Sequence, residues 1–154
     1  MDSRKIEAIY GINGPVIYLK GKTGFKMSEM VHVGKEKLVG EVISLDKDVT
    51  TIQVYEETSR LRPGEKVEAT GAAVSVTLAP GILNNIFDGI ERPLERIADD
   101  GGAFITRGVS VDSLDMDRLW ETHLTVAEGE SVHGGTVIAE VQETPAILHK
   151  CMVP

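Results

Sequence analysis

The sequence has few of the residues that most readily indicate a class of protein. It contains one cysteine, Cys151, and only seven aromatic side chains of Phe, Trp and Tyr in 154 residues. A single cysteine excludes an internal disulfide, so nothing indicates an oxidising compartment. No apolar run approaches the roughly 20 residues that span a bilayer, and the N-terminus lacks the apolar stretch of a signal peptide. Acidic residues outnumber basic ones, and the net charge of −8 argues against binding to a nucleic-acid backbone. These absences predict a soluble intracellular protein without direct membrane insertion, peripheral to any membrane it serves.

What is present fits a globular β-rich chain, with 42% hydrophobic and 26% charged residues. Residues 4–76 contain short runs with strand-like alternation, of which 38–45 and 50–55 are the clearest. Turn residues separate the runs, for example Arg62-Pro63-Gly64-Glu65, where proline presets φ and glycine permits a positive φ. Strand signals at this close spacing predict a small closed barrel or sandwich.

The stretch 82–97 shows a different periodicity. Its apolar residues Ile82, Leu83, Ile86, Phe87 and Ile90 recur at helical spacing. Pro and Gly precede the stretch, and Gly and Pro also punctuate its far end. The pattern predicts an amphipathic helix over 82–97 that links two β-rich parts.

The second part predicts a strand over 104–111, a short acidic helical turn over 112–120, and a strand over 137–141 between turn-forming residues. The chain stops at 152–154 on an apolar, strand-like run, which suggests a cut inside a larger protein. The sequence thus predicts a mainly β fold in three portions. These are a small closed N-terminal β-barrel (1–76), a short linking helix with its linker (77–103), and a second β-rich, barrel-sandwich-like domain that is truncated (104–154).

Two glycine-rich stretches come near a phosphate loop, which needs Gly-x4-Gly-Lys-Ser/Thr between a strand and a helix. Gly21-Lys22-Thr23 supplies only the end of that motif, because Val16 stands where the first glycine belongs. Residues 129–136 have the spacing, but Gly135 replaces the lysine. We therefore interpret both as turns.

Residues 126–140 also resemble half of a biotinyl or lipoyl carrier domain, in which a modified lysine sits at the tip of a hairpin. The corresponding turn, 143–146, contains no lysine, and Lys150 comes too late.

The remaining candidates for chemistry are scattered. His32, His123, His133 and His149 show no ligand spacing, and a surface or half-buried structural role is expected for each. We expect Cys151 to be a small buried hydrophobe, the cluster Asp112, Asp115 and Asp117 to be solvated, and Trp120 to be a core anchor. The types and spacing of these residues predict no catalytic, cofactor-binding or metal-binding residue.

Several stretches together resemble the N-terminal region of the catalytic A subunit of V-type and archaeal-type rotary ATPases. They are residues 11–16 (GINGPV), 38–43 (LVGEVI) running to 51–58 (TIQVYEET), 80–94 (PGILNNIFDGIERPL), 104–109 (FITRGV) and 143–154. The last two look like the bulge of that catalytic chain, an insertion that its non-catalytic partner lacks.

The resemblance implies that the intact catalytic chain hydrolyses or makes ATP with Mg2+ at an interface with the B subunit, coupled to H+ or Na+ translocation. Its phosphate loop, general base and Mg2+ ligands would lie beyond Pro154, so the resemblance implies no ATPase activity and no cofactor for this portion. The barrel would help form a crown around the A/B hexamer, and the bulge would face the peripheral stalk. The localisation implied is cytoplasmic, peripheral to the membrane in the ATPase head.

Two other interpretations stay open at this point. One is a carrier-type domain of a biotin- or lipoate-dependent enzyme without its modified lysine. The other is a free-standing barrel that binds nucleic acid, against which the charge and the scarcity of aromatic residues argue.

Overall fold

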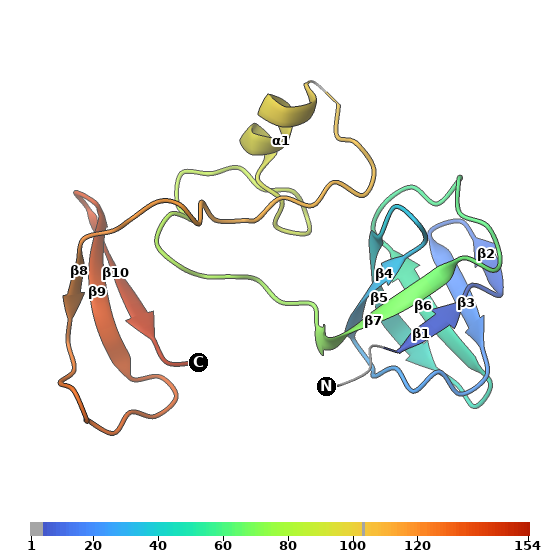
Figure 1. Cartoon of the computed structure of the whole chain (residues 1–154), viewed down its shortest axis with the longest axis horizontal. Helices are drawn as coiled ribbons and strands as arrows, with labels where there is room; N and C mark the ends of the chain where they lie inside the picture. Colours follow the sequence, from blue (N-terminus) through green and yellow to red (C-terminus); the bar gives the residue numbers. More distant parts are fainter. Residues whose placement is uncertain (1–4, 103) are drawn as a thin grey trace. The chain divides into compact units, whose positions relative to one another are not determined.

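The computed structural model describes residues 5–102 and 104–154. The chain is mainly β, as predicted, with one short helix and a second, smaller sheet (Figure 1). It forms two compact units, each described here by itself. The barrel unit comprises Met1–Val76 and Gly101–Ser110, and the second unit comprises Thr77–Asp100 and Val111–Pro154.

Seven antiparallel strands make the barrel unit, in the sheet order β1-β7-β4-β5-β6-β3-β2. In chain order they are β1 (Ile6–Ala8), β2 (Gly11–Asn13), β3 (Val16–Lys20), β4 (Glu29–Val33), β5 (Leu38–Leu45), β6 (Val49–Val54) and β7 (Lys66–Ala73). The two runs with the clearest alternation in the sequence became β5 and β6, which pair with each other.

One segment closes the barrel by changing partners. Its first part, β1, pairs with β7, and its second part, β2, pairs with β3. The change falls at two residues, where Ile9 N–H donates to Glu65 O at 2.9 Å and Tyr10 N–H donates to Tyr18 O at 2.8 Å. Because β1 and β2 stand at opposite ends of the strand order, this short segment joins the two edges and leaves little strand edge unpaired.

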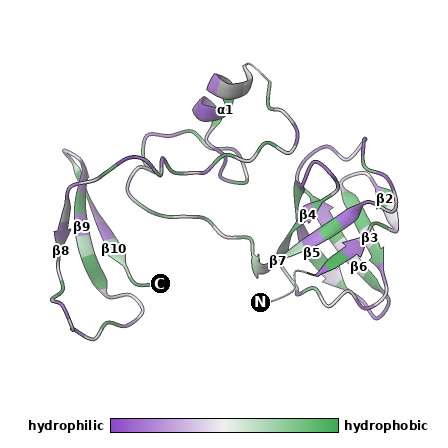
Figure 2. Cartoon of the chain, in the orientation of Figure 1, coloured by the Kyte–Doolittle hydropathy of each residue, from purple (hydrophilic) through white to green (hydrophobic). Residues whose placement is uncertain are grey.

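The barrel interior is filled by alternate aliphatic side chains from the strands. The ribbon in Figure 2, coloured by hydropathy, correspondingly shows hydrophobic (green) beside hydrophilic (purple) positions along the strands. The largest side chains that are almost fully buried are Ile17, Leu19, Val31, Val33, Leu38, Val42, Ile52 and Val67. Gly40 lets β5 and β6 approach, since a Cβ there would lie 2.9 Å from Gln53 O. Burial of this aliphatic set is the main stabilising contribution to the barrel.

The predicted helix over 82–97 is wrong in its extent. The helix α1 is Leu94–Gly101, and the apolar residues before it lie in turns and irregular backbone. Asn84 and Glu91 have φ values of 66° and 63°, which no right-handed helix allows. Asp88 also accepts the N–H groups of Ile90 and Arg92, and such local bonds compete with helix formation.

In the second unit, β8 (Thr122–Leu124), β9 (Val137–Thr144) and β10 (Ile147–Met152) form a sheet in the order β10-β9-β8. Ala139 and Val141 of β9 are buried on one face of this sheet. The strand predicted over 104–111 and the helical turn predicted over 112–120 are both wrong, because the described residues there form turns and bends.

The division into units also differs from the boundaries expected from sequence. Residues Gly101–Ser110 pack with the barrel, whereas the sequence placed everything from 104 onward in the second domain. No helix in the described part of the chain is long and apolar enough to cross a membrane.

Candidate functional site

The second unit is organised around a buried carboxylate. Glu143, near the end of β9, has a side chain only 3% exposed. Its Oε1 accepts N–H groups from Gly81 at 2.7 Å and Leu83 at 3.3 Å, and its Oε2 lies 3.2 Å from His149 Nδ1. The carboxylate therefore ties the loop that begins at Pro80-Gly81 to the β9–β10 hairpin.

The charge state of Glu143 follows from these contacts. Burial raises the pKa of the carboxyl group, but the two backbone N–H groups and His149 lower it by more. The net pKa lies below the ordinary glutamate value, so Glu143 is an anion at neutral pH.

The same loop is packed against the single tryptophan. A Cβ on Gly81, whose φ is +103°, would lie 3.3 Å from Trp120 Cζ2, and the Arg118 guanidinium lies 4.0 Å from the ring centroid. Asn85 Nδ2 donates to Gly81 O at 2.6 Å. Trp120 is half-buried and not fully buried as a core anchor would be, although it contacts Gly81 and Arg118.

A second carboxylate organises the following turn. Asp88 Oδ1 accepts N–H groups from Ile90 at 3.1 Å and Arg92 at 2.9 Å, and Asp88 Oδ2 pairs with Arg92 Nε at 2.7 Å. Burial raises the pKa of Asp88, and the contacts with Arg92 and Ile90 bring it below its ordinary value. The loop before α1 is thus shaped by two anionic side chains.

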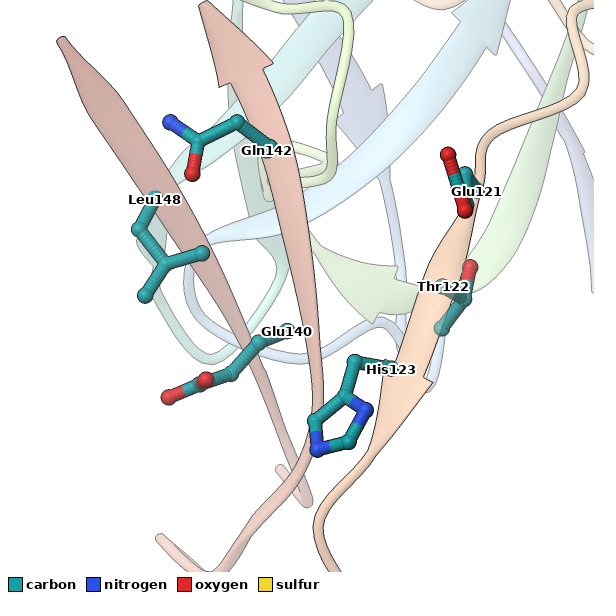
Figure 3. Close-up of a pocket in the computed structure, with 6 residues that line it drawn as sticks. All are labelled: Glu121, Thr122, His123, Glu140, Gln142 and Leu148. Atoms are coloured by element: carbon teal, nitrogen blue, oxygen red, sulfur yellow. The ribbon is translucent and has the colours of Figure 1, made fainter. Parts of the chain in front are cut away.

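A cleft of about 370 Å3 lies on the three-stranded sheet. Its lining residues are Glu121, Thr122, His123, Glu140, Gln142 and Leu148 (Figure 3). His123 lies opposite Glu140 and Leu148 lies opposite Gln142 in the strand register, so these four side chains share one face. This face is mainly polar, which suits hydrogen bonding to a partner surface.

The glycine-rich stretches serve as turns. Residues 21–24 lead into β4 and not into a helix, and Thr23 Oγ1 is hydrogen-bonded to Thr50 Oγ1 at 2.7 Å, both side chains being buried. Residues 129–136 lead into β9, with Gly135 N–H donating to Val153 O at 2.9 Å.

The residues considered for carrier chemistry and metal binding are spread apart. Lys150 lies within β10 opposite Glu140, away from the Pro145–Ala146 hairpin turn. His123 and His133 are exposed and His32 is half-buried, whereas Cys151 is half-buried and not buried as expected. Across residues 5–102 and 104–154, no three His, Cys, Asp or Glu side chains group to hold a metal ion.

Glu143 and its partners were missed as a site from sequence. The two N–H donors precede Glu143 by 60 and 62 residues, so no local pattern connects them. The available signal was a lone glutamate inside an alternating strand, on the face that carries Ala139 and Val141.

Two family models match the chain, one in each unit. Residues 9–71 match the ATP synthase alpha/beta family, beta-barrel domain, and residues 111–154 match the ATPsynthase alpha/beta subunit barrel-sandwich domain. The chain therefore belongs to the ATP synthase alpha/beta family.

Within that family the similarity is to the A subunit of the V- and A-types. The chain is 51% identical over 151 residues to the V-type ATP synthase alpha chain of Halothermothrix orenii, covering 98% of this chain and 25% of that protein. It is 50% identical over 146 residues to the A subunit of the A-type ATP synthase of Methanosphaera stadtmanae, covering 95% and 25%. It is 46% identical over 153 residues to the corresponding A subunit of Halobacterium salinarum, covering 99% and 26%. The chain corresponds to the N-terminal region of the A subunit and spans about a quarter of the length of these curated relatives.

Proposed function

We propose that the whole protein is the catalytic A subunit of a V/A-type ATP synthase or ATPase, which couples ATP hydrolysis or synthesis to H+ or Na+ translocation. The N-terminal region described above serves assembly of the A/B ring and contact with the peripheral stalk. The observation that carries the proposal is the matching of both the barrel and the barrel-sandwich domain along a chain that is 46–51% identical to its A-subunit relatives.

The barrel unit has the properties of an assembly element. Its closed sheet resists shear, and its exterior carries exposed apolar side chains on more than one strand, including Ile6 (51% exposed), Ile43 (38%) and Leu45 (42%). The barrel unit, residues 1–76 and 101–110, contains eleven acidic and twelve basic residues, so its net charge is too small to repel another copy strongly. Side-to-side packing of such barrels in a ring with the B subunit is the arrangement we propose.

The second unit has the properties of a polar contact. The second unit, residues 77–100 and 111–154, contains thirteen acidic and four basic residues, so the whole net negative charge of the chain lies there. The cleft on the three-stranded sheet adds Glu121 and Glu140 to hydrogen-bonding neighbours (Figure 3). A stalk protein that docks here would present basic and hydrogen-bonding side chains.

Assembly is tested with the whole A subunit, the B subunit and the stalk proteins. Barrel variants Ile6→Lys and Ile43→Lys should lower the yield of the A/B ring in native mass spectrometry. Charge-reversal variants Glu121→Lys and Glu140→Lys should leave the ring intact and weaken its association with the stalk, measured by co-purification. Rings that form equally well with both barrel variants would contradict the assembly role.

ATP and Mg2+ binding are proposed for the portion of the A subunit that follows Pro154. The isolated 154-residue chain should therefore show no ATPase activity and no heat of binding in a calorimetric titration with Mg-ATP. A micromolar site in that titration would overturn this part of the proposal and would place a nucleotide site within the two units.

A further inference from the structure

A small pocket of about 190 Å3 lies within the second unit, and all of its lining residues belong to that unit. They come from the loop before α1, from α1 itself and from the loop that precedes β8. The side chains with polar or aromatic groups in this lining are Asn85, Arg96, Ser113, Asp115, Arg118 and Trp120. The pocket is smaller than the roughly 300–1,000 Å3 of a site for a drug-sized ligand, so its size suits a small ion.

The pocket collects positive charge in a unit that has little of it. The second unit has thirteen acidic and four basic residues, and two of the four, Arg96 and Arg118, line this pocket. Of the other two, Arg92 is paired with Asp88, and Lys150 lies in β10. The positive charge at the pocket is therefore concentrated against the net charge of the unit around it.

Arg96, in α1, is held at the pocket by backbone carbonyls. Its Nη1 donates to Asp112 O and to Leu114 O, each at 3.0 Å, on the two sides of Ser113. Among the described residues these are the hydrogen bonds of its side chain. They use one of the three guanidinium nitrogens, so Nε and Nη2 keep their N–H groups for another acceptor.

Arg118 is held by an aromatic ring. Its guanidinium carbon lies 4.0 Å from the centroid of the Trp120 ring. Within residues 5–102 and 104–154, its guanidinium has no hydrogen-bond or ion-pair partner. Stacking on a ring positions an arginine without using its N–H groups, which remain available to an anion.

Asp115 reduces the positive charge of the lining without cancelling it. Its Oδ1 accepts the N–H of Asp117 at 3.1 Å, and in the described part of the chain it forms no ion pair with Arg96 or Arg118. The charged groups of the lining are thus two guanidinium groups and one carboxylate, a net charge of +1. A bound anion would be attracted by the two arginines and repelled by Asp115.

We propose that this pocket binds a small tetrahedral oxyanion of the phosphate class, held by Arg96 and Arg118. Guanidinium groups donate paired N–H groups to the oxygens of phosphate. The Asn85 amide and the Ser113 hydroxyl add donors from two further positions of the lining. Donors from three segments of the chain suit a tetrahedral acceptor better than a planar carboxylate. The bound anion ties α1 to the loop before β8 and thereby stabilises the second unit.

Trp120 makes binding measurable, because it is the single tryptophan of the chain and lines the pocket. The experiment titrates the folded 154-residue chain with inorganic phosphate at constant ionic strength and follows tryptophan fluorescence. Acetate and chloride are titrated in parallel. Phosphate should give a saturating change at millimolar concentration, and acetate and chloride a much weaker one. As a second measurement, independent of the tryptophan, phosphate should raise the temperature of unfolding followed by circular dichroism.

Three variants separate the pocket from the general charge of the unit. Arg118→Gln should weaken phosphate binding about five-fold, because it removes a guanidinium whose donors are free for the anion. Asp115→Asn should strengthen binding about three-fold, because it removes the opposing charge. Lys150→Gln is the matched control: it removes one positive charge from the same unit outside the pocket, and the affinity should stay within about two-fold of wild type.

Arg96→Gln should weaken binding to a similar extent as Arg118→Gln. Because Arg96 also bonds to the loop before β8, its variant is compared with wild type in the unfolding measurement without phosphate.

Several outcomes would overturn the proposal. They are a wild-type chain without a saturating response to phosphate, an equal response to chloride, equal weakening by Arg118→Gln and Lys150→Gln, and weaker binding by Asp115→Asn. An equal response to acetate would overturn the assignment of the pocket to a tetrahedral oxyanion.

Discussion

Replacement of Glu143 tests whether one buried carboxylate holds the second unit together. The side chain is 3% exposed and accepts two backbone N–H groups from the loop at Gly81 and Leu83, beside its contact with His149. Glu143→Ala removes all of these contacts and leaves the N–H groups of a packed loop without their acceptor. Glu143→Gln keeps an acceptor oxygen and removes the charge.

The expected magnitudes follow from these bonds. A hydrogen bond to a charged group contributes about 1.5–3 kcal/mol, and a buried donor left without a partner costs about 1–3 kcal/mol. Because the Gly81 bond at 2.7 Å is the short one of the pair, we expect about 3 kcal/mol of destabilisation for Glu143→Ala. For Glu143→Gln, which can still accept that bond, we expect about 1–2 kcal/mol.

Trp120 provides the assay. It is the single tryptophan of the chain and packs against Gly81, the residue that Glu143 binds. Urea unfolding followed by its fluorescence therefore reports on this loop, and linear extrapolation yields the free energy of unfolding of the second unit.

The effect also depends on pH with a definite sign. The folded pKa of Glu143 lies below its unfolded value of about 4.3, so the ionised side chain stabilises the fold above that pH. This contribution disappears as the pH falls through the folded pKa. The difference in stability between wild type and Glu143→Gln should be fully present at about pH 7 and should shrink below about pH 4.

Glu140→Gln is the control, since Glu140 is on the same strand but on the opposite face, at the cleft. Its effect should stay within about 0.5 kcal/mol, as for surface positions generally. If Glu143→Gln and Glu140→Gln change the stability equally, or if the Glu143→Gln effect is the same at about pH 7 and about pH 4, the account of this carboxylate is refuted.

Two further predictions concern the barrel. Gly40→Ala should destabilise it by about 1–3 kcal/mol through overpacking, because the new methyl group would lie 2.9 Å from Gln53 O. Gly11→Ala is the control and should change the stability little, because its Cβ would meet an ordinary contact at 3.8 Å. Thermal unfolding followed by circular dichroism compares the two variants. Tyr55 O–H donates to Glu41 Oε2 at 2.5 Å, and this hydrogen bond, with burial and the charge of Glu41, raises the pKa of the Tyr55 phenol. Glu41→Gln should therefore lower that pKa in an ultraviolet titration, and an unchanged titration would show that Glu41 does not hold the proton on Tyr55.

The barrel strands could be predicted because their signals are local. In β5 and β6 the alternation of aliphatic and polar residues matches the two faces of a strand, and the turns between runs carry their own conformational preferences. The family resemblance likewise depended on short motifs, and both family models confirm it.

The helix prediction failed for a reason that lies outside the apolar pattern. Residues 82–90 have helical spacing, but the carboxylate of Asp88 binds the following N–H groups, and Asn84 and Glu91 adopt positive φ. The spacing of apolar residues contains no information about either effect. The helix begins only at Leu94, after Pro93.

The sequence alone determined the mainly β class, the barrel strands and the family resemblance. The contacts of the Glu143 carboxylate, the packing of Trp120 and the hydrogen bond between Gly108 and Glu56 came only from the folded chain. Each of these depends on groups far apart in the sequence, such as the Glu56 carboxylate and the Gly108 N–H at a separation of 52. Which loops come into contact depends on how the sheets fold. That folding is driven by burial of the whole hydrophobic core, so no single stretch of sequence determines it.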